Sequence, residues 1–165
     1  MKRIIVFFIF LFIFASNYCF ATDYKISEEL QNQYRNEIYK TIKKELPKTK
    51  KKINKEFLNA QKTYNKYLKD KNKLNNTDKY VFELQNYQRG IEVYETIFIS
   101  LLIDITNKYK DINSDIPPTD FPGTLLEFLY PYFEANNIDY NQINEFDTYS
   151  ANKIKELDSL MEQIH

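Results

Sequence analysis

The chain has 165 residues, in which 23 basic side chains balance 23 acidic ones, and it contains one histidine, one cysteine and two glycines. The histidine is the last residue, His165, and the cysteine, Cys19, lies near the N-terminus. This composition nearly excludes a histidine-based catalytic triad, a cysteine nucleophile and a zinc site. The scarcity of glycine disfavours a hairpin-rich β architecture and a phosphate-binding loop. We therefore expect no enzymatic activity, no cofactor and no metal site.

The N-terminus has the layout of a secretory signal peptide. Lys2 and Arg3 precede an apolar run of 11 residues, Ile4–Phe14, and small and polar residues follow up to Ala21. The run is shorter than the roughly 20 apolar residues that a membrane-spanning helix needs. We expect cleavage after Ala21, so that residues 1–21 are a signal peptide and the mature protein is periplasmic or secreted, with no stable membrane span.

Cys19 leaves a lipid anchor as an alternative to simple cleavage. A bacterial lipidation site has small residues just before its cysteine, whereas Asn17 and Tyr18 precede Cys19. Cleavage after Ala21 removes the only cysteine, so the mature chain would form no disulfide even in an oxidising compartment.

The rest of the chain predicts an all-α fold, a bundle of four to five helices that includes long antiparallel ones. Residues 27–45 form the first predicted helix, whose apolar side chains recur every four residues: Leu30, Tyr34, Ile38 and Ile42. Pro47 is expected to separate it from a second helix, residues 48–74, because proline disrupts a helix interior. The predicted buried face of the second helix consists of Ile53, Phe57, Ala60, Tyr64 and Tyr67.

A third predicted helix covers residues 78–111 and has the highest apolar density of the chain. Its apolar stripe consists of Val93, Ile97, Leu101 and Ile105, and Phe98 and Leu102 broaden it. An apolar arc this wide predicts that the helix lies deep in the bundle. Gly90 is costly in a helix interior, by roughly 1 kcal/mol relative to alanine. It marks either a break into two helices or a close crossing with a neighbour.

An acidic C-terminal part follows a proline-rich linker at residues 113–122. We expect a short helix around residues 125–133, with a kink or stop at Pro131, and a last helix over residues 147–163. The predicted buried side chains of the last helix are Ile154, Leu157, Leu160 and Met161. Residues 113–165 are thus expected to form an extension that packs on the helical domain of residues 22–112.

Charge is distributed unevenly along the chain. Residues 22–110 carry 19 basic and 12 acidic side chains, whereas residues 111–165 carry 2 basic and 11 acidic ones. Either these are solvated helix faces, or the two halves pack against each other, or a basic surface holds an anionic partner. The lysines between Lys40 and Lys73 are expected to scatter around their helix, which together with the predicted export disfavours a nucleic-acid partner.

The second and third predicted helices carry a motif. Ala60 and Gln61 are followed by Tyr64 and Tyr67, and further along come Gly90, Tyr94, Leu101 and Thr106. This arrangement resembles the LprI-like N-terminal domain family, which is named for a lysozyme inhibitor, and the resemblance covers about residues 30–112.

The chain departs from the family pattern at the two positions where the family has cysteines. Asn72 stands where the family has its first cysteine, and Leu101 stands near the position of the second. Tyr64 replaces a tryptophan, and Tyr109 replaces an arginine. We expect Leu101 to be buried where the family has a disulfide between two helices.

The resemblance implies an exported, non-enzymatic helical binding protein, with a lysozyme-type glycan hydrolase as its first candidate partner. The matching positions are expected to be structural: Ala60, Gln61, Tyr64, Tyr67, Tyr94, Leu101 and Thr106. Exposed lysines around residues 73–79 could enter a lysozyme cleft, which holds two acidic residues. The alternative is a periplasmic helical adaptor or immunity-type protein that binds another envelope protein.

Overall fold

The computed structural model describes residues 2–70, 77–113 and 124–164, and the side chains of residues 2–27, 111 and 113 lie outside this description. Every regular element in the described part is helical, which confirms the predicted all-α fold. The elements are α1 (Lys2–Asp70), α2 (Thr77–Lys108), the 3-10 turn η1 (Lys110–Asn113), α3 (Leu125–Ala135) and α4 (Asn141–Glu162).

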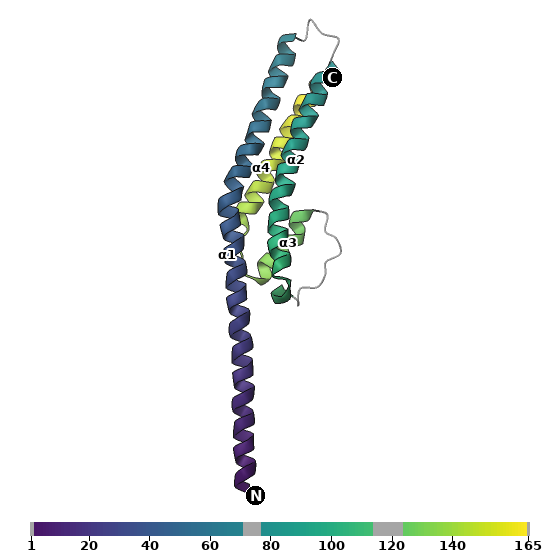
Figure 1. Cartoon of the computed structure of the whole chain (residues 1–165). Helices are drawn as coiled ribbons and strands as arrows, with labels where there is room; N and C mark the ends of the chain where they lie inside the picture. The colour runs from purple at the N-terminus through teal and green to yellow at the C-terminus, as the bar shows by residue number, and fades with distance from the viewer. Residues whose placement is uncertain (1, 71–76, 114–123, 165) are drawn as a thin grey trace.

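The bundle is built on a long antiparallel pair, α1 and α2 (Figure 1). α4 runs beside both of them, and the short α3 packs on α2 near its C-terminal end. The N-terminal part of α1, purple in Figure 1, continues beyond the end of the bundle. The predicted signal peptide falls in that part, where side chains lie outside the described residues, so its cleavage stays a prediction.

The predicted break at Pro47 is wrong, because α1 is a single helix through this position. Leu46 and Ile53 are buried on either side of the proline, so their packing holds both halves of the helix against the core. The hydroxyl of Thr49 donates a hydrogen bond of 3.0 Å to the carbonyl oxygen of Glu45 in the same turn. Proline and such local hydrogen bonds bend helices without ending them, and Figure 1 shows that α1 bends midway.

The predicted core face of α1 is confirmed at most positions. Leu30 and Tyr64 are half-buried. The others are buried: Tyr34, Ile38, Ile42, Ile53, Phe57, Ala60 and Tyr67.

The predicted core face of α2 is confirmed at Phe98 and Leu102, which are buried, and wrong at Val93, Ile97 and Leu101. Val93, Ile97 and Leu101 are 52%, 54% and 39% exposed, and Ile105 is half-buried. The buried residues lie on the other side of the helix: Tyr80, Leu84, Ile91, Phe98, Ile99, Leu102 and Thr106. The helix carries apolar side chains over most of its circumference between residues 97 and 105, and α1, α3 and α4 all pack on the side of Phe98 and Leu102.

Gly90 lies inside the continuous helix α2 and does not break it. A Cβ atom at this position would lie 3.4 Å from Cγ of Glu56 on α1. This is an ordinary van der Waals distance to one flexible side chain, so the close crossing stays a prediction, whereas the interpretation as a helix break is wrong.

The C-terminal helices differ from prediction at their ends. Thr124 and Glu127 form a reciprocal capping box that starts α3, and α3 continues past Pro131 to Ala135. α4 begins at Asn141, earlier than residue 147, because Ile143 and Phe146 are already buried in its first turns. The ring of Phe146 lies 5.1 Å from that of Phe98 on α2. Leu157 is buried as predicted, whereas the other predicted core residues of α4 are half-buried: Ile154, Leu160 and Met161.

Candidate functional site: a lysine stripe on α1

One face of α1 carries a row of exposed lysines, which we call the lysine stripe. Successive members are three, four or seven residues apart, so they share one face of the helix. The members are Lys40, Lys44, Lys48, Lys51, Lys55, Lys62, Lys66 and Lys69. At 1.5 Å per residue the stripe extends over about 44 Å. The lysines of this part of α1 are therefore concentrated on one face and not evenly scattered, although Lys43, Lys50 and Lys52 lie off it.

The lysines of α1 that lie off the stripe are largely engaged by the bundle itself. Nζ of Lys52 lies 5.2 Å from the ring centre of Tyr94 on α2, and Nζ of Lys50 lies 5.9 Å from that of Tyr149 on α4. These cation–π contacts explain part of the lysine content by structure alone.

The stripe itself is only partly neutralised. Glu45 forms ion pairs with Lys44 at 3.2 Å and with Lys48 at 3.0 Å. Hydrogen bonds from Lys48 and then Lys44 lower the pKa of the Glu45 carboxyl. Among the described residues, Lys51, Lys55 and Lys62 form no ion pair.

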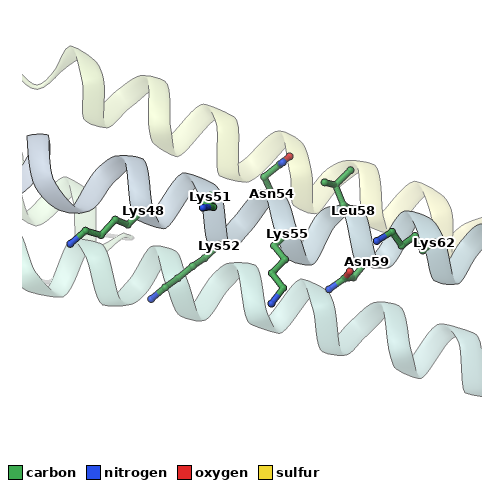
Figure 2. Close-up of a pocket in the computed structure, with 8 residues that line it drawn as sticks. All are labelled: Lys48, Lys51, Lys52, Asn54, Lys55, Leu58, Asn59 and Lys62. Carbon is green, nitrogen blue, oxygen red and sulfur yellow. The ribbon is translucent and has the colours of Figure 1, made fainter.

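These unpaired lysines border an open hollow of about 630 Å³ on the surface of α1 (Figure 2). Leu58, which is 46% exposed, lies where the stripe is interrupted. No acidic residue belongs to the lining, which consists of Lys48, Lys51, Lys52, Asn54, Lys55, Leu58, Asn59 and Lys62. Ammonium groups donate three hydrogen bonds and accept none, so the hollow suits carboxylate or phosphate oxygens.

Carboxylates gather on a second surface, formed by α3, α4 and the turn between them. We call it the acidic surface, and its exposed members are Glu127, Glu134, Asp139, Glu145, Glu156, Asp158 and Glu162. In the described part of the chain no ion pair joins α1 to α4. α4 packs against α1 and α2, and α3 packs against α2, so the two halves of the charge asymmetry do pack against each other, without an ion pair between α1 and α4.

The family-motif residues lie mostly inside the bundle. Ala60, Tyr67 and Thr106 are buried, whereas Gln61, Tyr64 and Tyr94 are half-buried. The hydroxyl of Tyr67 donates to the carbonyl oxygen of Ile164 at 3.3 Å, and that of Tyr64 donates to Oε1 of Gln163 at 2.6 Å. These contacts fasten the end of α4 to α1, which is a structural role.

Leu101 is the exception among the motif residues, because it is exposed and the expectation that it is buried is wrong. Asn72 and residues 73–76 of the turn lie outside the described residues. Lys79, the last lysine of that turn, is exposed at the start of α2.

A half-buried carboxylate lies between α2 and α4. The hydroxyl of Ser150 on α4 donates a hydrogen bond of 2.5 Å to Oε2 of Glu95 on α2. Burial raises the pKa of Glu95, the Ser150 hydrogen bond lowers it, and the nearby Asp147 raises it further. No group of three or more metal-binding side chains occurs in the described part of the chain.

Comparisons with known proteins add no assignment: the chain matches no family model, no curated protein and no solved structure. The resemblance to the LprI-like family therefore stays a prediction. Among the described residues, no helix has an apolar stretch long enough to cross a bilayer.

Proposed function

We propose that the protein is an exported, non-catalytic adaptor that binds the acidic face of another protein along the lysine stripe. The observation that carries this proposal is the row of exposed lysines on α1, of which Lys51, Lys55 and Lys62 have no ion-pair partner among the described residues. Unpaired like charges in a row repel one another, and binding of an anionic partner relieves this repulsion.

The lining of the hollow favours a protein surface as the partner. Leu58 offers an apolar contact in the middle of the lysines, and Asn54 and Asn59 offer amide groups. No aromatic side chain lines the hollow, so it has no platform on which nucleic-acid bases could stack. All eight side chains that line the hollow come from the single helix α1 (Figure 2), which suits a broad partner surface and not an enclosed small molecule.

Export is supported by the basic, apolar and small-residue layout of residues 1–21. N-terminal sequencing of the protein recovered outside the cytoplasm is expected to begin at or near Thr22. A first residue of lipid-modified Cys19 would establish the anchored alternative instead.

Charge reversal tests the lysine stripe directly. We expect the triple variant Lys51→Glu, Lys55→Glu, Lys62→Glu to lose binding to poly-L-glutamate, a stand-in for an acidic protein face, at low salt. The control variant Lys43→Glu, Lys79→Glu, Lys110→Glu has the same net charge at exposed positions off the stripe, and it is expected to retain binding. Equal binding by both variants, or no binding by the unmodified protein, would contradict the proposal.

The acidic surface favours a second candidate function, inhibition of a lysozyme-type glycan hydrolase. Common lysozymes are basic, so exposed carboxylates on α3 and α4 would steer them to this surface, and the steering would weaken as salt rises. A cell-wall clearing assay with lysozyme tests this candidate. Inhibition that is lost in Glu145→Lys, Glu162→Lys and kept in the lysine-stripe variant would support it, whereas clearing that is unaffected at tens of micromolar protein would reject it.

A further inference from the structure

α2 presents an uncovered aliphatic face to solvent. Val93, Ile97 and Leu101 follow one another at intervals of four residues, so they form a straight stripe on one side of the helix, which we call the aliphatic stripe. About half of each of the first two side chains is exposed, and nothing in the described part of the chain covers them. A contiguous exposed apolar face of this kind marks a contact surface more often than a solvated one.

The charges at the ends of the aliphatic stripe are arranged in a self-complementary way. Arg89 lies one turn before Val93, and Asp104 lies one turn after Leu101, and both are exposed on the same side of α2. Neither forms an ion pair with any described residue. Along this face of α2, from its N-terminal to its C-terminal end, a basic side chain is followed by the aliphatic stripe and then by an acidic side chain.

An antiparallel second copy fits this order. When two α2 helices cross antiparallel with Ile97 at the two-fold axis, Val93 of each copy meets Leu101 of the other. The same register brings Arg89 of each copy beside Asp104 of the other, so that both ends of the contact carry opposite charges. Such an isologous contact is the commonest way in which identical chains pair.

We propose that the aliphatic stripe is a homodimer interface in which two copies pair antiparallel along α2. The mixture of charges favours a second copy over a membrane surface, because anionic lipid headgroups would repel Asp104. A face of α2 from Phe82 to Lys108 is about 39 Å long, and a contact about 10 Å wide along it covers about 400 Å² of each copy. This is about half the usual area per partner, so we expect a weak, concentration-dependent dimer.

A charge-swap experiment tests the register. Equilibrium sedimentation of the full mature chain is expected to show a monomer–dimer equilibrium. Arg89→Asp alone and Asp104→Arg alone are each expected to weaken dimerisation about 10-fold or more, because each places like charges opposite one another. The double variant Arg89→Asp, Asp104→Arg restores opposite charges and is expected to return within about 3-fold of the unmodified protein.

Ile97→Asp is expected to abolish dimerisation. Because Ile97 is exposed, the variant is expected to stay folded, and circular dichroism checks that its helices remain. Leu68→Asp is the matched control, since Leu68 is a similarly exposed aliphatic side chain on α1, at 48%. Three outcomes would overturn the proposal: a monomer at all concentrations up to several hundred micromolar, a double variant no better than the single ones, or binding to anionic vesicles that Ile97→Asp removes while no dimer is detected.

Discussion

Tyr34 and Thr106 are 72 positions apart in the chain, yet their hydroxyl oxygens lie 2.9 Å apart in the core between α1 and α2. Thr106 also donates to the carbonyl oxygen of Leu102 at 2.9 Å. A hydroxyl has one proton to donate, so Tyr34 is the donor in the pair. Burial raises the pKa of Tyr34 to about 12, and Thr106 opposes part of that rise because its hydroxyl can turn to donate to the phenolate.

The raised pKa of Tyr34 predicts a loss of stability in alkali. A tyrosine in the unfolded chain titrates near pH 10, so the contribution of neutral Tyr34 is complete below that pH. It is lost as the pH rises from about 10 to about 12. At about 1.4 kcal/mol per pKa unit, the loss approaches 2 to 3 kcal/mol. Urea unfolding of the protein and of Tyr34→Phe at increasing pH measures it.

Tyr34→Phe is expected to be less stable by about 1 kcal/mol at neutral pH, because it lacks one buried hydrogen bond. Its stability should then fall less steeply above pH 10 than that of the unmodified protein. Parallel curves for the two proteins across this range would contradict the assignment, because other tyrosines would then account for the whole alkaline transition.

Leu101 and Leu102 form a matched pair for testing the orientation of α2. Leu102 is fully buried, and Leu102→Ala is expected to cost 2–5 kcal/mol, about the usual range for a core leucine. Leu101 is 39% exposed, and Leu101→Ala is expected to cost less than about 1 kcal/mol. Denaturant unfolding at low protein concentration measures both. A larger loss for Leu101 would mean that α2 is rotated relative to the structure described here.

Glu95 predicts a stability change in the acidic range. Its pKa is raised chiefly by burial, so the folded protein holds the proton more tightly than the unfolded chain does. This contribution is present below the unfolded pKa, about 4.3, and is lost as the pH rises through the folded value. Glu95→Gln cannot ionise, so its stability relative to the unmodified protein should increase from pH 4 to pH 7. A difference that is constant over this range would show that the pKa of Glu95 is the same in the folded and unfolded states.

Gly90 predicts a stabilising substitution. Its place in the middle of α2 costs conformational entropy that alanine does not, by roughly 1 kcal/mol. The added Cβ would meet only the side chain of Glu56, which can rotate aside. Gly90→Ala is therefore expected to raise the free energy of unfolding by about 0.5 to 1 kcal/mol. A decrease would show that the two helices cannot separate by even a few tenths of an ångström here.

The core of α1 could be predicted from sequence because its apolar positions keep a single helical period. Tyr34, Ile38 and Ile42 have polar neighbours on all other sides of the helix, so only one face can be buried. Pro47 misled the prediction since the rule for proline considers local geometry alone, whereas packing of Leu46 and Ile53 decides whether the helix continues.

The orientation of α2 could not be predicted in the same way. Two helical stripes are equally apolar: one contains Ile97 and Leu101, and the other contains Phe98 and Leu102. Which stripe faces the core depends on where α1 and α4 lie, and the sequence of α2 does not contain that information. The lysine stripe was predictable, because its spacing obeys the same period as the apolar residues. The sequence does not show which of the lysines contact a carboxylate or an aromatic ring in the folded protein.

The antiparallel pairing of α1 and α2 also determines the order in which the hairpin can assemble. Tyr67 and Tyr80 contact each other at a ring separation of 5.6 Å although only a short chain segment connects them, whereas Tyr34 and Thr106 meet at the far end of the same helix pair. The entropy lost on closing a loop grows with the length of the loop, so Tyr67 and Tyr80, which are close in the chain, are expected to meet first. Once they are in contact, each later contact between the helices closes only the short segment that remains free. We therefore expect pairing of the two helices to start at the Tyr67 end and the Tyr34–Thr106 hydrogen bond to be the last of these contacts to form.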